Sequence, residues 1–365
     1  MTHKISTLFT LLIFANTLFA QQKEGKATGK EKTLAVPLQK FPDKGFPENT
    51  YPIAEIRFVQ VVPDSTRLGY LQNSRNTKVT AIPDMQLTNY FQSYINKKYE
   101  SSYNKDGLHF LWVLKNIRVG QRSFAGIDRA YLYFNAAAYC SRDGDNYNFL
   151  TSLDTVLVIA DESYGTSLHY NNIREALRLL LYQSIDRGSN FAAAGNNFSV
   201  TQIVSRERER FNFPIYTDST FREGAYANFK EFINNAPSIT DYKTVVMNKN
   251  ETVIIGGEKD TITPWGICKK GELYKYYSGS LVSIEKQSNE FVLSDYVAAI
   301  NRRNTNIANV ALFGNVVLNV AGGIAGRFLA TRLSDGVITV TSIPYIKKKQ
   351  PEACTINMET GDWFF

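Results

Sequence analysis

Hydrophobic and polar positions form strand-like patterns in several stretches of the first half of the chain, and in one of them they alternate, as in a strand with one buried face. Residues 53–62 show it first. Residues 109–119, 130–140 and 149–160 are rich in Val, Leu, Tyr and Phe, with polar turns between them. Because polar turns join these last three runs, we predict an antiparallel meander.

Two other stretches have the spacing of an amphipathic helix. In residues 85–99 the apolar side chains recur every three or four positions. A second stripe follows Asn171 and Asn172, which we expect to cap a helix that ends near residues 186–188. The predicted order is therefore strand, helix, three strands, helix. The stripes consist of Leu87, Tyr90, Phe91, Tyr94 and Ile95, and of Ile173, Ala176, Leu177, Leu180 and Leu181.

The second half has one short helix whose caps are visible in the sequence. Asn228 is placed to accept a hydrogen bond from the amide three positions on while Glu231 reaches back, which is a capping box. Pro237 is expected to stop this helix. Short strands are predicted at residues 244–248, 252–255, 266–268, 273–277 and 291–293.

Chain length favours two domains, because 365 residues exceed the usual size of one small core. Residues 188–202 are rich in Gly, Ser, Asn and Ala, which is typical of a linker. We predict an α+β fold of two antiparallel-sheet domains with a few helices: an N-terminal domain over residues 47–187 and a β-rich C-terminal domain over residues 203–365.

The N-terminus has the pattern of a cleavable secretory signal. Lys4 gives a positive start, residues 8–19 are mostly apolar but too short to cross a bilayer, and Ala20 ends the run. Cleavage is expected after Ala20. No cysteine follows, so we expect no lipid attachment at a new N-terminus. Residues 21–46 are rich in Lys, Gly and Pro and are predicted to be a flexible leader.

Residues 307–329 form an apolar insertion long enough to cross a bilayer. Gly322 and Gly326 have the spacing that lets two helices approach closely in a membrane, whereas two Asn and an Arg count against a simple span. Three interpretations stay open: a membrane span, a membrane-inserting or self-associating segment, and a buried apolar helix or hairpin.

The net charge of +7 does not indicate nucleic-acid binding. Much of the surplus lies in lysines of the leader and of residues 347–349, which lack periodicity, whereas a nucleic-acid binder places basic residues along a structured face. An anionic membrane surface is the one charged partner that remains plausible. Cys140, Cys268 and Cys354 allow one disulfide and one thiol, or three buried thiols.

No residue cluster has a recognisable catalytic, cofactor-binding or metal-binding pattern, so we predict none of these sites. A serine-type mechanism would need His109 or His169 as the base, and neither lies in a motif. Residues 143–145 are interpreted as a hairpin turn, residues 206–210 as solvated alternating charge, and residues 363–365 are not interpreted as the end of a membrane barrel. The acids weighed as a carboxylate pair for glycoside hydrolysis are Asp143, Asp145, Asp161 and Glu162.

Two resemblances to known families add expectations. The turn Asp64-Ser65-x-Arg67-Leu68-Gly69, with the order of elements around it, makes residues 50–185 resemble the small α+β domain of bacterial envelope lipoproteins of the transport-auxiliary type. That resemblance implies a non-enzymatic accessory role. Those proteins are usually lipid-anchored, and this chain departs from them by lacking the anchoring cysteine.

The second resemblance covers residue 213 to the C-terminus. It is carried by the pattern Phe221-x-x-Gly224-x-Tyr226-x-Asn228-Phe229-x-Glu231-Phe232-x-x-Asn235-x-Pro237, with Trp265-Gly266-Ile267-Cys268 and Met358-Glu359-Thr360-Gly361. This half is similar to a family of secreted proteins of unknown function from Bacteroidota-type bacteria. The resemblance implies export and no particular activity.

The function predicted from the sequence is that of an exported envelope protein, in the periplasm, at the outer-membrane face or outside the cell. We expect it to act by non-enzymatic binding or scaffolding. One alternative is a secreted hydrolase with an unrecognised active site. Another is a membrane-anchored oligomer built through residues 307–329.

Overall fold

The computed structural model describes residues 32–38, 51–72, 78–124, 127–161, 167–191, 197–248, 251–257, 260–294, 338–340, 343 and 350–365. The chain divides into two compact units, Met1–Lys32 and Thr33–Phe365, and the account below concerns the second. Its strands lie in mostly antiparallel sheets with few helices, which confirms the predicted α+β class. The predicted signal peptide and the apolar insertion at residues 307–329 lie outside the described residues.

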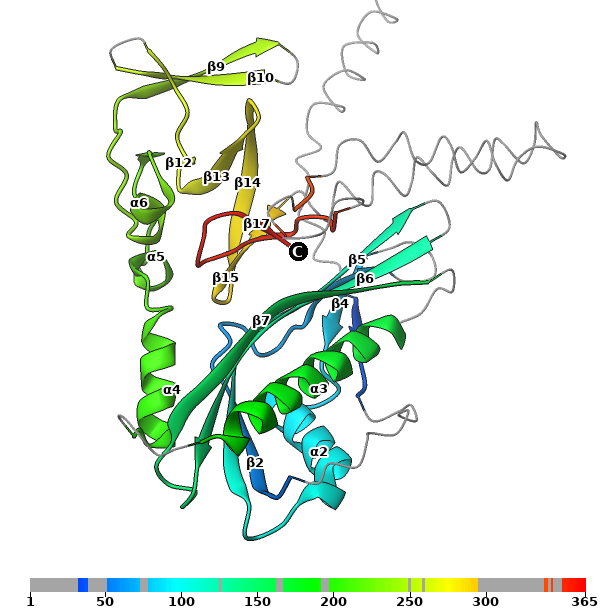
Figure 1. Cartoon of the computed structure of the whole chain (residues 1–365). Helices are drawn as coiled ribbons and strands as arrows, with labels where there is room; N and C mark the ends of the chain where they lie inside the picture. The colour runs from blue at the N-terminus through cyan, green and yellow to red at the C-terminus, as the bar shows by residue number, and fades with distance from the viewer. Residues whose placement is uncertain are drawn as a thin grey trace, which may run out of the picture. The chain divides into compact units, whose positions relative to one another are not determined.

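The first sheet contains the predicted antiparallel meander as β5, β6 and β7, with β7 at its edge (Figure 1). The strand order is β1-β4-β3-β5-β6-β7, and β2 pairs in parallel with β5. The predictions for residues 53–62, 109–119, 130–140 and 149–160 are confirmed as β2, β5, β6 and β7. The strands are β1 Thr33–Ala35, β2 Ile53–Gln60, β3 Gly69–Gln72, β4 Lys78–Ile82, β5 Leu108–Phe124, β6 Ile127–Ser141 and β7 Asn148–Asp161.

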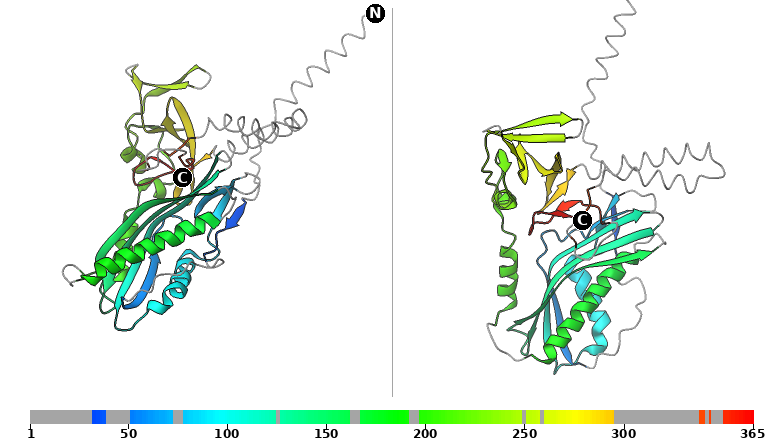
Figure 2. Two further views of the ribbon diagram at one scale, coloured as in Figure 1. Left: turned by 45° about the vertical axis from the view of Figure 1, so that its right-hand side comes forward. Right: turned by 45° about the horizontal axis from the view of Figure 1, so that its top comes forward.

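Two helices cover one face of this sheet, because each buries the apolar stripe identified in the sequence (Figure 2). They are α2, Leu87–Tyr99, and α3, Ser167–Ser189. The predicted cap at Asn171 and Asn172 is wrong, since α3 begins at Ser167. Asn172 is fully buried, and its Nδ2 donates to the carbonyl oxygen of Ala130 at 3.0 Å, so it anchors the helix to β6.

The opposite face is covered at one end by α4, Val200–Glu209. Ser199 caps α4 in a capping box with Gln202, so the predicted linker already contains the start of a helix. The charges of residues 206–210 are not all solvated as expected: Glu207 is buried and its Oε1 lies 3.0 Å from Nζ of Lys115 on β5. This ion pair fastens α4 to the sheet.

The second half contains a sheet of order β17-β16-β15-β14-β13-β12-β8 and a small sheet of order β11-β10-β9. The strands predicted here are confirmed as β9, β10, β12, β13 and β15, whereas the eight-residue strand β14 and the short strands β8, β11, β16 and β17 were missed. The strands are β8 Gly224–Tyr226, β9 Tyr242–Asn248, β10 Glu251–Gly256, β11 Thr261–Ile262, β12 Gly266–Lys269, β13 Glu272–Tyr277, β14 Ser280–Gln287, β15 Glu290–Leu293, β16 Thr355–Ile356 and β17 Trp363–Phe364.

Short helices precede and flank this second sheet: α5, Pro214–Thr217, and α6, Phe229–Ile233. The predicted cap of α6 is confirmed, because the Glu231 amide donates to Oδ1 of Asn228 at 3.1 Å. Glu231 reaches back one residue further than a capping box requires and accepts from the Ala227 amide at 2.8 Å.

The C-terminal residues are part of the protein core. Phe365 is 1% exposed and packs on Gly120 of β5, where an added Cβ would lie 2.6 Å from its ring. Phe364 makes an edge-on contact with Tyr133 of β6, with ring centroids 4.9 Å apart. The aromatic tail therefore covers the part of the first sheet that α4 leaves open.

Part of the predicted flexible leader also belongs to the fold, which corrects that prediction. Thr33–Ala35 forms β1, which pairs in parallel with β4, and Val36 and Leu38 are almost fully buried. The three cysteines are buried thiols, the second of the two alternatives. Of the helices in the described ranges, none is long and apolar enough to cross a membrane.

Candidate functional site at the edge of the first sheet

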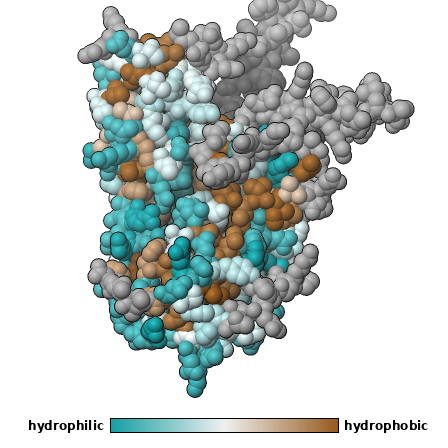
Figure 3. Space-filling view, in the orientation of Figure 1, coloured by the Kyte–Doolittle hydropathy of each residue, from teal (hydrophilic) through white to brown (hydrophobic). Residues whose placement is uncertain are grey.

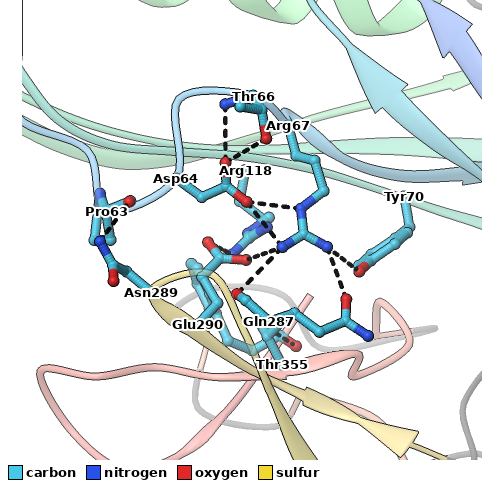
Figure 4. A network of polar contacts seen from close by, with 11 residues as sticks. Pro63, Asp64, Thr66, Arg67, Tyr70, Arg118, Gln287, Asn289, Glu290 and Thr355 are labelled. Atoms are coloured by element: carbon cyan, nitrogen blue, oxygen red, sulfur yellow. Dashed lines mark hydrogen bonds and ion pairs between the residues drawn. The ribbon is translucent and has the colours of Figure 1, made fainter. Parts of the chain in front are cut away.

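The turn of residues 64–69, noted in the sequence for its resemblance, is the joint between the two large sheets (Figure 4). Asp64 accepts hydrogen bonds from Thr66 and from Nε of Arg67, the latter at 2.8 Å. Arg67 then reaches the turn between β14 and β15, where its Nη1 donates to Oε1 of Gln287 at 2.9 Å. Gly69 has a φ of +135°, and an added Cβ would lie 2.1 Å from the Val119 carbonyl oxygen. Only glycine fits there.

A second buried arginine completes this joint. Arg118 of β5 is 4% exposed and donates to Oε1 of Glu290 at the start of β15. Oε2 of the same carboxylate lies 3.8 Å from Nη2 of Arg67. Two arginines therefore face two carboxylates, Asp64 and Glu290, and the cluster carries no net charge.

The titration of these groups reflects their pairing. Burial by itself would raise the pKa of Asp64, but the hydrogen bonds from Thr66 and the charge of Arg67 outweigh burial and lower it. Burial likewise opposes the charge on Arg118, yet the carboxylate of Glu290 beside it raises the pKa of that guanidinium. These shifts favour the charged forms of Asp64 and Arg118, and the joint is an ionic clamp of structural character.

The outer edge of β2 is a second feature of the first sheet. β2 pairs with β5 on one side, and no described strand pairs with its other side. A hollow of about 860 Å³ lies along this edge, with Glu55 and Arg57 of β2 facing Thr88 and Asn96 of α2. A second, separate hollow of about 710 Å³ lies at the end of β2, between residues 60–63 and the outer face of α4.

β7 exposes two large apolar side chains. Phe149 is 58% exposed and Val158 is 40% exposed, and they lie nine residues apart. On the face that Figure 3 views, hydrophobic residues lie in several separate groups among hydrophilic ones. β7 is the last strand of the first sheet, so its outer edge is not paired with any described strand. Neither of the two hollows described above is lined by β7.

One predicted base, His109, lies beside the hollow of β2. The strand register places Glu55, His109 and Ser141 in a row across β2, β5 and β6. Nδ1 of His109 lies 3.6 Å from Oε2 of Glu55, which is the carboxylate–imidazole arrangement of a serine hydrolase. The Ser141 hydroxyl, however, is buried and donates to Asp143 at 2.6 Å, so its proton is directed away from the imidazole.

Asp143 and Asp145 lie in the turn between β6 and β7, as predicted. Asp143 accepts from the amides of Asn146 and Asp145, both at 2.9 Å. The hydrogen bonds from the Asn146 amide and the Ser141 hydroxyl hold the pKa of Asp143 well below its ordinary value. This carboxylate is fully used in shaping the turn.

The other predicted residues lie at the far end of the sheet. His169 is buried, and its Nε2 lies 3.3 Å from Oε1 of Gln121. Gln121 follows His109 by twelve residues on β5, which corresponds to roughly 40 Å. Asp161 ends β7 in register with Asp128, at the same far end. His109 therefore lies far from His169, and Asp143 and Asp145 lie far from Asp161. Glu162 lies outside the described residues.

Metal binding would require ligands that converge. In the part of the chain that the structure describes, no three His, Cys, Asp or Glu side chains approach closely enough to hold a metal ion.

The residues that do gather at the edge of β2, above all Gln92 of α2, carry no motif. Their only sequence signal is a polar position on the flank of an amphipathic helix.

Two solved structures resemble part of this chain. No protein-family model matches the sequence, and no curated protein matches it. A crystal structure of protein XCC0632 from Xanthomonas campestris, of family DUF330, is 14% identical with a TM-score of 0.28, over 44% of this chain and 98% of that chain. A crystal structure of an uncharacterized protein is 10% identical with a TM-score of 0.21, over 44% of this chain and 96% of that chain.

Proposed function

We propose that the chain is an exported envelope protein that acts by binding another protein. The observation that carries this proposal is the pair of hollows, one along the outer edge of β2 and one beside α4. Their linings combine apolar side chains, such as Val200 and Val204, with exposed charges, such as Arg57 and Glu55. A mixed lining of this kind suits a polypeptide partner better than a small apolar ligand.

Export is supported by the sequence pattern of residues 1–20 and is tested separately. The protein should be recovered from the cell envelope or the medium with Gln21 as its first residue. N-terminal sequencing of the material from each cell fraction measures this. Recovery of the uncleaved chain from the cytoplasm alone would contradict export.

Binding is tested by site-specific photo-crosslinking in the producing cells. A photoreactive amino acid replaces Arg57 at the edge of β2 or Thr201 on α4, and Glu272 of β13 serves as an exposed control position. We expect a discrete crosslinked species from positions 57 and 201 and none from position 272. Absence of any such species, or equal labelling at all three positions, would contradict the proposal.

A hydrolase is the second candidate, because the row of Glu55, His109 and Ser141 contains the residue types that such a mechanism needs. The buried hydroxyl of Ser141 speaks against it, since it is bonded to Asp143. The membrane-anchored oligomer stays a prediction, because it depends on residues 307–329, which lie outside the described residues.

A further inference from the structure

On the outer edge of β2, the side chain of Gln92 makes the backbone hydrogen bonds that a neighbouring strand would make. The Phe58 amide donates to Oε1 of Gln92 at 2.7 Å, and Nε2 of Gln92 donates to the carbonyl oxygen of Ile56 at 2.9 Å. In a parallel ladder, one residue of the neighbouring strand makes both of these bonds, around the residue that lies between them. The Gln92 carboxamide thus takes the place of the N–H and C=O groups that one residue of a neighbouring strand would present opposite Arg57.

The edge also has room for a strand. The hollow of about 860 Å³ lies directly beside it and is bounded by Thr88 and Asn96 of α2 on one side and by Glu55 and Arg57 on the other. A strand edge of this kind pairs readily with another chain unless it is blocked. At Ile53 the edge is taken by an isolated bridge with Tyr103, whose neighbour Asn104 donates its amide to the Ile53 carbonyl oxygen at 2.7 Å. At Ile56 and Phe58 it is covered by the side chain of Gln92.

We propose that an extended segment of a partner protein adds to the first sheet in parallel with β2, displacing the Gln92 carboxamide. This inference rests on the proposed binding function and specifies its site. The occupant is a polypeptide, because the outward groups of Ile56 and Phe58 already match the donor and acceptor of an amide.

Charges on the edge specify part of the partner's sequence. Glu55 and Arg57 are two residues apart and therefore project from the same face of β2, where both are exposed. In a parallel strand the residue opposite Glu55 comes two positions before the residue opposite Arg57. Opposite charges are favoured between such neighbours, so the bound segment should read basic, any residue, acidic.

The Gln92 side chain competes with the partner for the same two backbone groups. Removing the carboxamide should therefore raise the affinity for the partner about five- to tenfold, the effect of the hydrogen bonds that no longer have to be exchanged. Gln92→Ala and Gln92→Met both remove the amide, and Met keeps the length of the side chain. Gln183→Ala on α3 is the matched control, since Gln183 is also a partly exposed helical glutamine.

The experiment uses a phage-displayed library of random twelve-residue peptides, selected against the full chain, the three glutamine variants and the double variant Glu55→Arg/Arg57→Glu. Enriched peptides are then synthesised, and fluorescence anisotropy measures their affinity. We expect a basic-x-acidic pattern with the wild type, an acidic-x-basic pattern with the double variant, and five- to tenfold tighter binding to both Gln92 variants but not to Gln183→Ala. Backbone N-methylation at the acidic position should abolish binding.

The proposal is overturned if no peptide is enriched by the wild type or the Gln92 variants. It is equally overturned if the double variant selects the same pattern as the wild type, or if neither Gln92 variant gains affinity. Crosslinking from position 201 alone would then retain the proposed binding function and reject this site, so the two failures are distinguishable.

Discussion

The ionic clamp between the sheets can be tested by removing one of its charges. Arg118→Met deletes the buried guanidinium that donates to Glu290 and leaves a side chain of similar length. The carboxylate of Glu290, only 14% exposed, then keeps a single cation nearby, Arg67 at 3.8 Å. The double variant Arg118→Met/Glu290→Leu removes both charges and leaves no unpaired carboxylate.

The expected losses of unfolding free energy follow from this difference between the single and the double variant. Breaking a buried pair from one side costs about 3–5 kcal/mol, because an uncompensated charge stays buried. Replacing both partners by apolar residues is often close to neutral. We therefore expect Arg118→Met to lose about 3 kcal/mol of unfolding free energy, and the double variant to recover about 2 kcal/mol of that loss.

Urea denaturation followed by tryptophan fluorescence measures these differences. Trp112 lies in the core of the first sheet, whereas Trp265 and Trp363 lie in the second half, so fluorescence reports on both. Arg142→Met, at an exposed arginine of the turn between β6 and β7, is the control and should change stability by less than about 0.5 kcal/mol. A double variant as unstable as Arg118→Met, or less stable, would refute the reasoning.

Four further measurements test other parts of the structure. Burial lowers the pKa of His169 to about 3, so below pH 6.5 the unfolded chain binds a proton that the folded chain does not. About 2 kcal/mol of the free energy of unfolding should therefore be lost between pH 6.5 and 5. Denaturation measured at several pH values should show this loss in the wild type and not in His169→Gln. Gly69→Ala should cost about 3 kcal/mol or more and Gly271→Ala only about 1 kcal/mol, since both have positive φ but only Gly69 has backbone against its Cβ position; equal losses in urea midpoint would contradict this. Ser141→Ala should leave any hydrolysis of p-nitrophenyl acetate unchanged, and loss of a wild-type activity would favour the hydrolase. Phe365→Ala should lower the thermal midpoint through a loss of about 3–4 kcal/mol, and an unchanged midpoint would show that the C-terminal ring does not pack on the first sheet.

The elements with regular patterns were predictable, because their burial follows from local periodicity. α2 presents one apolar face to the core, so period 3.6 is sufficient to find it. β5 and β6 are buried on both faces, so they are recognisable as runs rich in apolar and aromatic residues. The start of α3 was not, because Asn172 resembles a cap in sequence but is buried against β6. The role of Asn172 depends on its contact with Ala130 of β6, which local sequence does not show.

The missed features depend on partners distant in sequence. β14 contains Ser, Glu and Lys among its apolar residues, since most of its side chains are only partly buried. The clamp joins residues 220 positions apart, and nothing near Arg67 indicates Gln287. Gln92 resembles any polar residue on the flank of a helix until the edge of β2 is seen beside it.

The clamp also has a consequence for how the chain folds as it is made. Arg67 is synthesised 220 residues before its partner Gln287. At 5–20 residues per second, the ribosome needs roughly 10–45 s to make the chain between them. During that time the face of the first sheet that later receives the turn between β14 and β15 has no cover from the second sheet. Contacts of such sequence separation also slow folding, so the nascent chain passes through a long aggregation-prone stage in which chaperone binding would protect it.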